Sequence, residues 1–168
     1  MLFRSGIAAA SGSTIAFTGQ IAVAMTWHAI SYTGVDQTGG ATTFPETNSD
    51  STTAATPNPL TGADIVSVAD NAVLAIAGQG TDTLASWGGT NPLTEQTDQA
   101  DNATTTTHGS MADRLVTGSE TVAVECTWVS QNRSCVASIE IAAFTAAPDV
   151  AKALPSFFLC FAAAIALG

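Results

Sequence analysis

The sequence predicts an all-β fold, an antiparallel β-sandwich with an apolar C-terminal extension. Several segments alternate apolar and polar residues with a period of two, the spacing of a strand that buries one face. The 168 residues include 25 Thr and 31 Ala, and Gly and Pro occur where turns are expected. Only 14 acidic and 4 basic residues are present, too few for a long helix stabilised by Glu/Lys pairs. These observations together favour strands over helices.

The charge balance limits the partners of the protein. The net charge is −10 and the isoelectric point is about 4.1. Four cations cannot neutralise a run of phosphates, so we expect no nucleic-acid partner. A surface built from Thr, Ser, Asn and acids keeps particles apart by repulsion. It suits an extracellular or salt-exposed setting, although the N-terminus lacks the apolar region of a signal peptide.

The first segments of the chain divide into an arm and the start of a domain. Residues 1–13 are small and rich in Gly and Ser, and predict a flexible arm or a lead-in strand. The predicted sandwich domain covers residues 14–147. Residues 14–32 are apolar and alternate in their second part, which predicts a strand. Residues 37–62 are polar with several Pro and Gly, and predict a surface excursion holding a short strand.

A central strand follows a turn in the middle of the chain. Asp70-Asn71 is a turn signal, and the apolar run 72–78 suits a strand covered on both faces. Residues 104–107 are β-branched and predict an edge strand. Residues 111–116 predict another short strand.

The segment 121–143 predicts a hairpin. Folding it between residues 130 and 131 places Val122 opposite Ile139 and Cys126 opposite Cys135, with apolar residues on one face of each strand. In this register the two cysteines form a possible disulfide. The alternative is two buried free thiols.

The last segment, 148–168, is an apolar tail. Residues 153–168 carry no charge but fall short of the roughly 20 residues of a membrane-spanning helix. They could form a last strand, lie at a membrane interface or dock on another subunit, and we favour cover by protein over a membrane. The residues of this possible assembly tail are Leu154, Phe157, Phe158, Leu159, Phe161, Ile165 and Leu167.

Residues with catalytic or metal-binding chemistry are sparse, and we expect no catalytic site and no cofactor. His108 and Ser110 lie together but without an orienting acid nearby in sequence, so a loop histidine is favoured over a hydrolase. Glu95, Asp98 and Asp101 offer a weak possibility of calcium, although a solvated acidic loop is favoured because the spacing matches no EF-hand.

One aromatic residue suggests a ligand. Trp87 lies in a Gly-rich stretch, where its ring could stack on a sugar. A plug beneath a loop is at least as good an interpretation of the same residue.

The order of these segments resembles a known module. Residues 31–36 (SYTGVD) end a strand, a Pro/Thr-rich excursion follows, and residues 70–76 (DNAVLAI) begin the next apolar strand. Over about residues 14–144 this resembles a β-sandwich module of phage structural proteins and secreted bacterial proteins. The resemblance implies jelly-roll-like strands and placement on a virion or cell surface, and it brings no catalytic residues.

The sequence thus predicts a non-enzymatic virion structural protein, a capsid or tail surface component that assembles with copies of itself and with other virion proteins. The alternative is a secreted adhesin or carbohydrate-binding module. A hydrolase that uses His108 is a third, weaker hypothesis.

Overall fold

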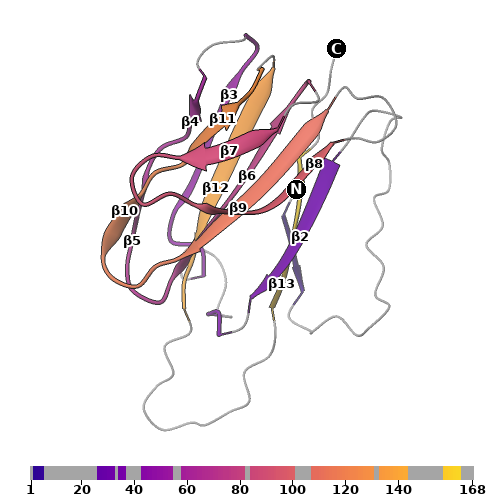
Figure 1. The fold of residues 1–168 in the computed structure, drawn as a ribbon. Helices are drawn as coiled ribbons and strands as arrows, with labels where there is room; N and C mark the ends of the chain where they lie inside the picture. Colours follow the sequence, from indigo (N-terminus) through magenta and orange to yellow (C-terminus); the bar gives the residue numbers. More distant parts are fainter. Residues whose placement is uncertain are drawn as a thin grey trace, which may run out of the picture.

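The structure, a computed structural model, describes residues 2–5, 26–32, 34–36, 43–54, 58–81, 84–100, 107–130, 133–143 and 157–163. It confirms the predicted all-β class, because the described residues form strands and no helix, and every pairing between these strands is antiparallel. Figure 1 shows the strands packed as a β-sandwich. The strands are β1 (Leu2–Ser5), β2 (Thr26–Tyr32), β3 (Thr47–Thr52), β4 (Leu60–Thr61), β5 (Ile65–Ser67), β6 (Ala72–Gln79), β7 (Ala85–Gly88), β8 (Thr94–Ala100), β9 (His108–Leu115), β10 (Glu120–Val122), β11 (Glu125–Trp128), β12 (Ser134–Ile141) and β13 (Phe157–Ala163).

A five-stranded sheet in the order β3-β12-β6-β9-β8 forms the centre of the molecule. The predicted central strand is confirmed: β6 lies between β12 and β9, and all of its residues are buried. Asp70 makes the predicted turn before β6 with a positive φ of 71°. The predicted strand over 111–116 is also present, as part of β9.

Two small sheets cover one face of this central sheet, and we call them the inner layer. They have the orders β4-β11-β7 and β10-β5. Val73, Ala75 and Val136 on the central sheet pack against Val124 and Trp128 of the inner layer in one buried cluster. Burial of these apolar side chains is the main stabilising contribution on this side.

A third sheet, β1-β13-β2, covers part of the opposite face, and we call it the outer sheet. Ile30 and Tyr32 of β2 pack on a second buried cluster that includes Leu74, Met111 and Ile139. In Figure 1, β2 and β13 lie together beside the central sheet. The central sheet is therefore buried on both faces where the outer sheet covers it.

The predicted hairpin over 121–143 is wrong. β11 pairs with β4 and β7, whereas β12 pairs with β3 and β6 in the central sheet. The two segments face each other across the sandwich instead of lying side by side, because each face of β12 has a buried apolar residue that packs against a different layer. Val136 faces the inner layer, while Ile139 faces the outer sheet.

Candidate functional site

Strands near the two ends of the chain, β1 and β13, pair in the outer sheet. β13 is its central strand and pairs with β1 on one side and β2 on the other, with Leu159 opposite both Arg4 and Ile30. The tail therefore forms a last strand over 157–163, and the N-terminal segment forms a lead-in strand over 2–5. Of the predicted assembly tail, Phe157, Phe158, Leu159 and Phe161 lie in β13, and Leu154, Ile165 and Leu167 lie outside the described residues.

His108 has an acidic partner that is not apparent from its neighbours in sequence. Its Nε2 donates a hydrogen bond to Asp98 Oδ1, and Asp98 Oδ2 accepts one from the backbone N–H of Ala85 at 3.1 Å. The imidazole also meets the Trp128 ring edge to face, with the ring centroids 5.8 Å apart. The His108 side chain is 4% exposed, so this pair joins the central sheet to the inner layer from within.

The contact between His108 and Asp98 could have been predicted only from the pairing of β8 with β9. The acidic segment from Glu95 was expected to be a loop, but residues 94–100 form an edge strand. In its register Asp98 lies opposite Ser110, one step diagonal to His108. The acidic residues of this segment thus alternate between faces.

This alternation bears on the expected calcium ligands. Asp98 points inward to His108, whereas Glu95 is exposed, and Asp101 lies outside the described residues. Among the residues that the structure describes, no group of three or more acidic, His or Cys side chains is arranged to hold a metal ion. Burial and the nearby Asp98 carboxylate raise the pKa of Glu95.

Trp87 occupies an intermediate position between core and surface. It lies on β7, is partly buried against the inner-layer core, and its Nε1 donates a hydrogen bond of 2.9 Å to Ser110 Oγ. The side chain therefore plugs the space between β7 and β9. Its indole N–H is already engaged within the protein.

The second histidine lies on the opposite side of the β8–β9 hairpin. His28 of β2 is 4% exposed, and a hydrogen bond of 2.6 Å joins its Nδ1 to Thr97 Oγ1. Burial lowers the pKa of His28; the nearby Asp98 carboxylate opposes this shift and His108 adds to it. Both histidines of the chain are thus anchored to neighbouring residues of β8.

The predicted disulfide is not present, because Cys126 and Cys135 are free thiols. Cys126 lies opposite Leu60 and Trp87 in the inner layer, and Cys135 lies opposite Ser51 and Gly78 in the central sheet. Burial raises the pKa of both thiols, which disfavours the reactive thiolate.

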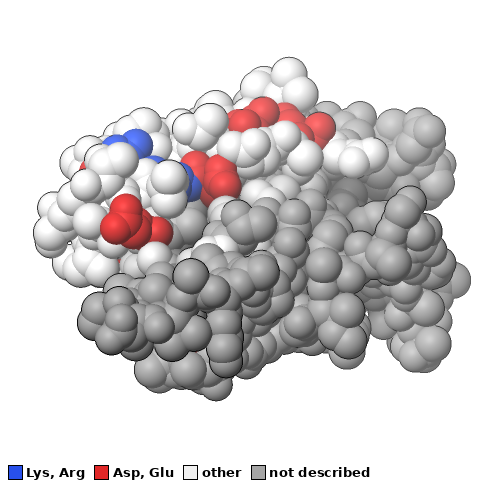
Figure 2. Space-filling model, turned by 90° about the horizontal axis from the view of Figure 1, so that it is seen from below, with Lys and Arg blue, Asp and Glu red and all other residues white. Residues whose placement is uncertain are grey.

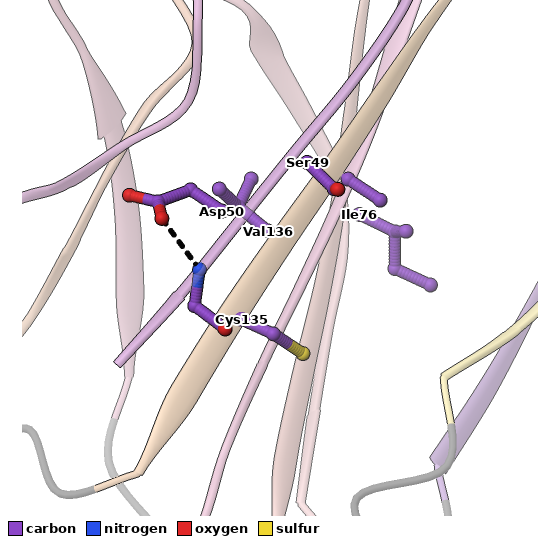
Figure 3. A pocket seen from close by; sticks show the side chains of 7 residues that line it. Ser49, Asp50, Ile76, Cys135 and Val136 are labelled. Carbon is purple, nitrogen blue, oxygen red and sulfur yellow. Dashed lines mark hydrogen bonds between the residues drawn. The ribbon is translucent and has the colours of Figure 1, made fainter. Parts of the chain in front are cut away.

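A shallow groove of about 390 Å³ opens beside Cys135. Its lining residues come from β3, β6 and β12: Ser49, Asp50, Ser51, Ile76, Cys135, Val136 and Ala137. In Figure 3 the Asp50 carboxylate points to the side of the sheet away from Cys135 and Ile76. The Cys135 and Ile76 side chains point to the same side of the sheet in this view. Asp50 Oδ1 accepts a hydrogen bond of 2.8 Å from the backbone N–H of Ser51.

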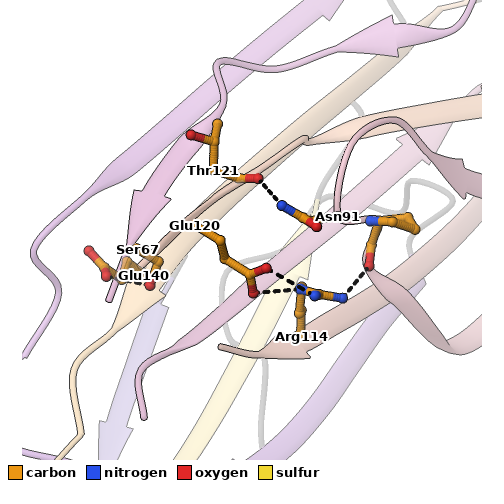
Figure 4. Close-up of polar contacts among 7 residues, drawn as sticks. Ser67, Asn91, Arg114, Glu120, Thr121 and Glu140 are labelled. Carbon is orange, nitrogen blue, oxygen red and sulfur yellow. Dashed lines mark hydrogen bonds and ion pairs between the residues drawn. The ribbon is translucent and has the colours of Figure 1, made fainter. Parts of the chain in front are cut away.

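Buried or paired acidic residues stabilise the opposite end of the sandwich, and Figure 4 shows Glu140 beside Ser67 and Glu120 beside Arg114. Buried Glu140 accepts hydrogen bonds from Ser67 Oγ at 2.6 Å and from Asn71 Nδ2 at 2.7 Å. Arg114 forms a bidentate ion pair with Glu120. Its Nε lies 2.8 Å from one carboxylate oxygen and its Nη2 lies 3.1 Å from the other. The ion pair lowers the pKa of Glu120. These contacts tie β5 and β10 of the inner layer to β12 and β9 of the central sheet.

No helix long and apolar enough to cross a membrane occurs among the described residues. Comparisons with protein-family models, with curated proteins and with solved structures found no match. The function is therefore inferred from the geometry of the chain itself.

Proposed function

We propose that the protein is a non-enzymatic structural component of a virion, at the surface of a capsid or tail, and that it acts by assembling with copies of itself and with other virion proteins. The observation that carries this proposal is the outer sheet, which both ends of the chain build. Its central strand, β13, is an apolar segment near the C-terminus. The jelly-roll-like module that the sequence resembles is consistent with this placement.

A terminal strand at the centre of a sheet suits assembly for a geometric reason. Thirteen residues, 144–156, separate β13 from the last described residue of the domain. A chain of that length can span roughly 40 Å when extended. The same strand can therefore complete the outer sheet of its own chain or of a neighbouring copy, as in strand exchange between identical subunits.

The two edge strands of the central sheet are, by contrast, protected against pairing with strands of other molecules. β3 is a polar edge strand on which the Asp50 carboxylate caps the N–H of Ser51. β8 carries a register shift between Glu95 and Thr97. Charged side chains and bulges of this kind discourage sheet-to-sheet association. On the face shown in Figure 2, acidic groups are spread over a largely uncharged described surface.

The assembly proposal is tested by measuring the mass of the particle in solution. We expect full-length protein to form oligomers by size-exclusion chromatography with light scattering, and a chain ending at Ala147 to remain monomeric. Leu159→Pro provides a second variant, because proline removes a ladder donor from the central strand of the outer sheet. Circular dichroism checks that each variant keeps its strands. Identical monomers for folded full-length and truncated protein would contradict the proposal.

A carbohydrate-binding module is the second candidate, and the groove beside Cys135 is the observation that favours it. Ser49 and Ser51 share one face of the sheet with Ile76 and Cys135. Hydroxyl groups beside apolar side chains can bind the polar edge and the apolar face of a sugar ring. A glycan array separates the two possible contacts. Loss of binding with Ser51→Ala would support the groove, loss with Trp87→Ala would support the indole, and no binding by the wild-type protein would contradict this function.

A further inference from the structure

Two polar side chains on neighbouring strands of the central sheet are buried without a partner. Ser138 of β12 is 2% exposed, and it lies opposite Asn48 of the edge strand β3. Ser138 Oγ and Asn48 Nδ2 are both shielded from solvent, and neither has a hydrogen-bond partner among the residues that the structure describes. An unbonded polar group in a protein interior is costly, so native proteins satisfy nearly all of them, often with an ordered water.

Both side chains point toward the inner layer. Val136 and Glu140 lie two residues before and after Ser138 on β12. Val136 packs in the buried cluster shared with the inner layer, and Glu140 accepts a hydrogen bond from Ser67 of β5. Alternate residues of a strand share a face, so Ser138 and its cross-strand neighbour Asn48 face the inner layer as well. The strands β3, β4, β5 and β6, which contact this strand, all lie in the described part of the chain.

The strand register brings the two groups together without bonding them to each other. β3 and β12 lie side by side (Figure 1), and the backbone N–H of Glu140 donates to the Glu46 carbonyl at 2.8 Å. Ser138 and Asn48 are the next hydrogen-bonded pair along this antiparallel ladder, in which paired Cα atoms lie about 5.5 Å apart. A water molecule about 2.7–3.2 Å from each polar atom suits side chains that rise together from such a pair.

The chemistry of the pair selects water over an ion. A hydroxyl and an amide are both neutral, so they supply no charge to bind an ion. Water can accept the hydrogen bond that Asn48 Nδ2 donates and can also donate to Ser138 Oγ. The carboxyl group of Glu140, on the same face of β12, disfavours an anion. In the described ranges, no group of three or more acidic, His or Cys side chains is placed to hold a metal ion.

We propose that Ser138 and Asn48 bind a buried structural water, which links the edge strand β3 to β12 on the side of the central sheet that faces the inner layer. β3 has the sequence TNSDST, without a hydrophobic residue, so apolar packing cannot fix its inner face. Polar contacts must do so in addition to the backbone ladder. The bound water extends the buried polar contacts of Glu140 by one strand, to the edge of the sheet.

A crystal structure of the full chain, at a resolution that shows ordered solvent, tests the proposal directly. We expect one water within about 2.7–3.2 Å of both Ser138 Oγ and Asn48 Nδ2. A direct hydrogen bond between the two side chains would overturn the proposal, and so would a site without water.

A double-mutant cycle tests the same site in solution. We expect Ser138→Ala and Asn48→Ala each to raise the equilibrium constant for unfolding roughly 5-fold, because each removes one partner of the water. The double variant should raise it by less than the product of the two single effects, since both substitutions remove the same bridge. Effects that multiply would contradict a shared water. A lower unfolding constant in Ser138→Ala would also contradict it, because deleting an unbonded buried hydroxyl stabilises a protein.

Ser49→Ala is the matched control for the serine substitution. Ser49 lies on β3 next to Asn48 and is exposed on the opposite face of the sheet, where it pairs with Ala137. We expect this variant to change the unfolding constant by less than about 2-fold. An effect as large as that of Ser138→Ala would assign the loss to the strand preference of serine and would contradict the water site.

Discussion

At the scale of single residues, Asn71 makes more connections than its position in a turn suggests. Its Nδ2 donates to the buried Glu140 carboxylate, and its Oδ1 accepts a hydrogen bond of 2.9 Å from the backbone N–H of Ala143. We expect Asn71→Ala to lower the free energy of unfolding by about 2–3 kcal/mol, because it leaves a buried carboxylate short of a donor. Urea denaturation measures the change.

Gln96 provides the control for that variant. Its amide donates to Asp113 Oδ1 at 2.7 Å, but the contact is exposed to water. Gln96→Ala should therefore change the stability by less than about 0.5 kcal/mol. Equal effects of the two substitutions would contradict the importance of burial at Asn71.

Two glycines with positive φ allow the cost of backbone strain to be measured with and without a steric clash of an added Cβ. Gly34 has φ 72° and open space where a Cβ would lie, whereas Gly89 has φ 85° and a Cβ there would lie 2.5 Å from the Ala123 Cβ. We expect Gly34→Ala to cost about 1 kcal/mol and Gly89→Ala to cost more, by about 1 kcal/mol or above. Thermal denaturation measures the loss of stability in each variant. Equal losses would contradict a steric clash at Gly89 and show that the backbone near Ala123 moves to accommodate the added Cβ.

At the scale of strands, the edge of β3 depends on one acidic residue. Asp50 places a charge at the edge and occupies the Ser51 N–H. We expect Asp50→Val to increase aggregation several-fold in light scattering, since it exposes a strand edge and adds a β-branched apolar residue. Asp64→Val is the matched control, because it removes the same charge from an exposed residue that precedes β5. Comparable aggregation of both variants would assign the effect to net charge instead of the edge.

The strands also show which information the sequence carries. The continuous apolar run of β6 predicted a strand covered on both faces, and the structure agrees. Alternation in β12 did not reveal its partner, because Val136 and Ile139 are both buried on opposite faces and either face could have been the one that meets β11. Period-two patterns give the faces of a strand, but the choice of neighbour depends on contacts far apart in the chain.

The same limit applies to the candidate sites. The sequence singled out His108 and Trp87, but their partners, Asp98 and Ser110, become neighbours only through the pairing of β8 with β9. An edge strand rich in polar residues, such as β8, has the amino-acid composition of a loop. Position 98 therefore looked like a surface acid, although its carboxylate points into the sandwich.

At the scale of the whole molecule, the three stacked layers account for the low content of charged residues. The central sheet contacts the inner layer on one face and the outer sheet on the other, so β6 and β12 each bury apolar residues on both faces. Few positions are then left for charge, and most of those are acidic. The result is a repelling surface around a sandwich whose two chain ends share one sheet.

This charge predicts how assembly responds to salt. Copies that each carry a net charge of −10 repel one another, and raising the ionic strength from about 0.01 M to about 0.15 M shortens the screening length from about 30 Å to about 8 Å. We therefore expect the average mass measured by light scattering to increase with salt for the full-length protein. The variant Asp64→Asn/Glu95→Gln, which neutralises two exposed acids, should reach the same mass at lower salt. Dissociation on adding salt would instead mean that attraction between unlike charges joins the copies.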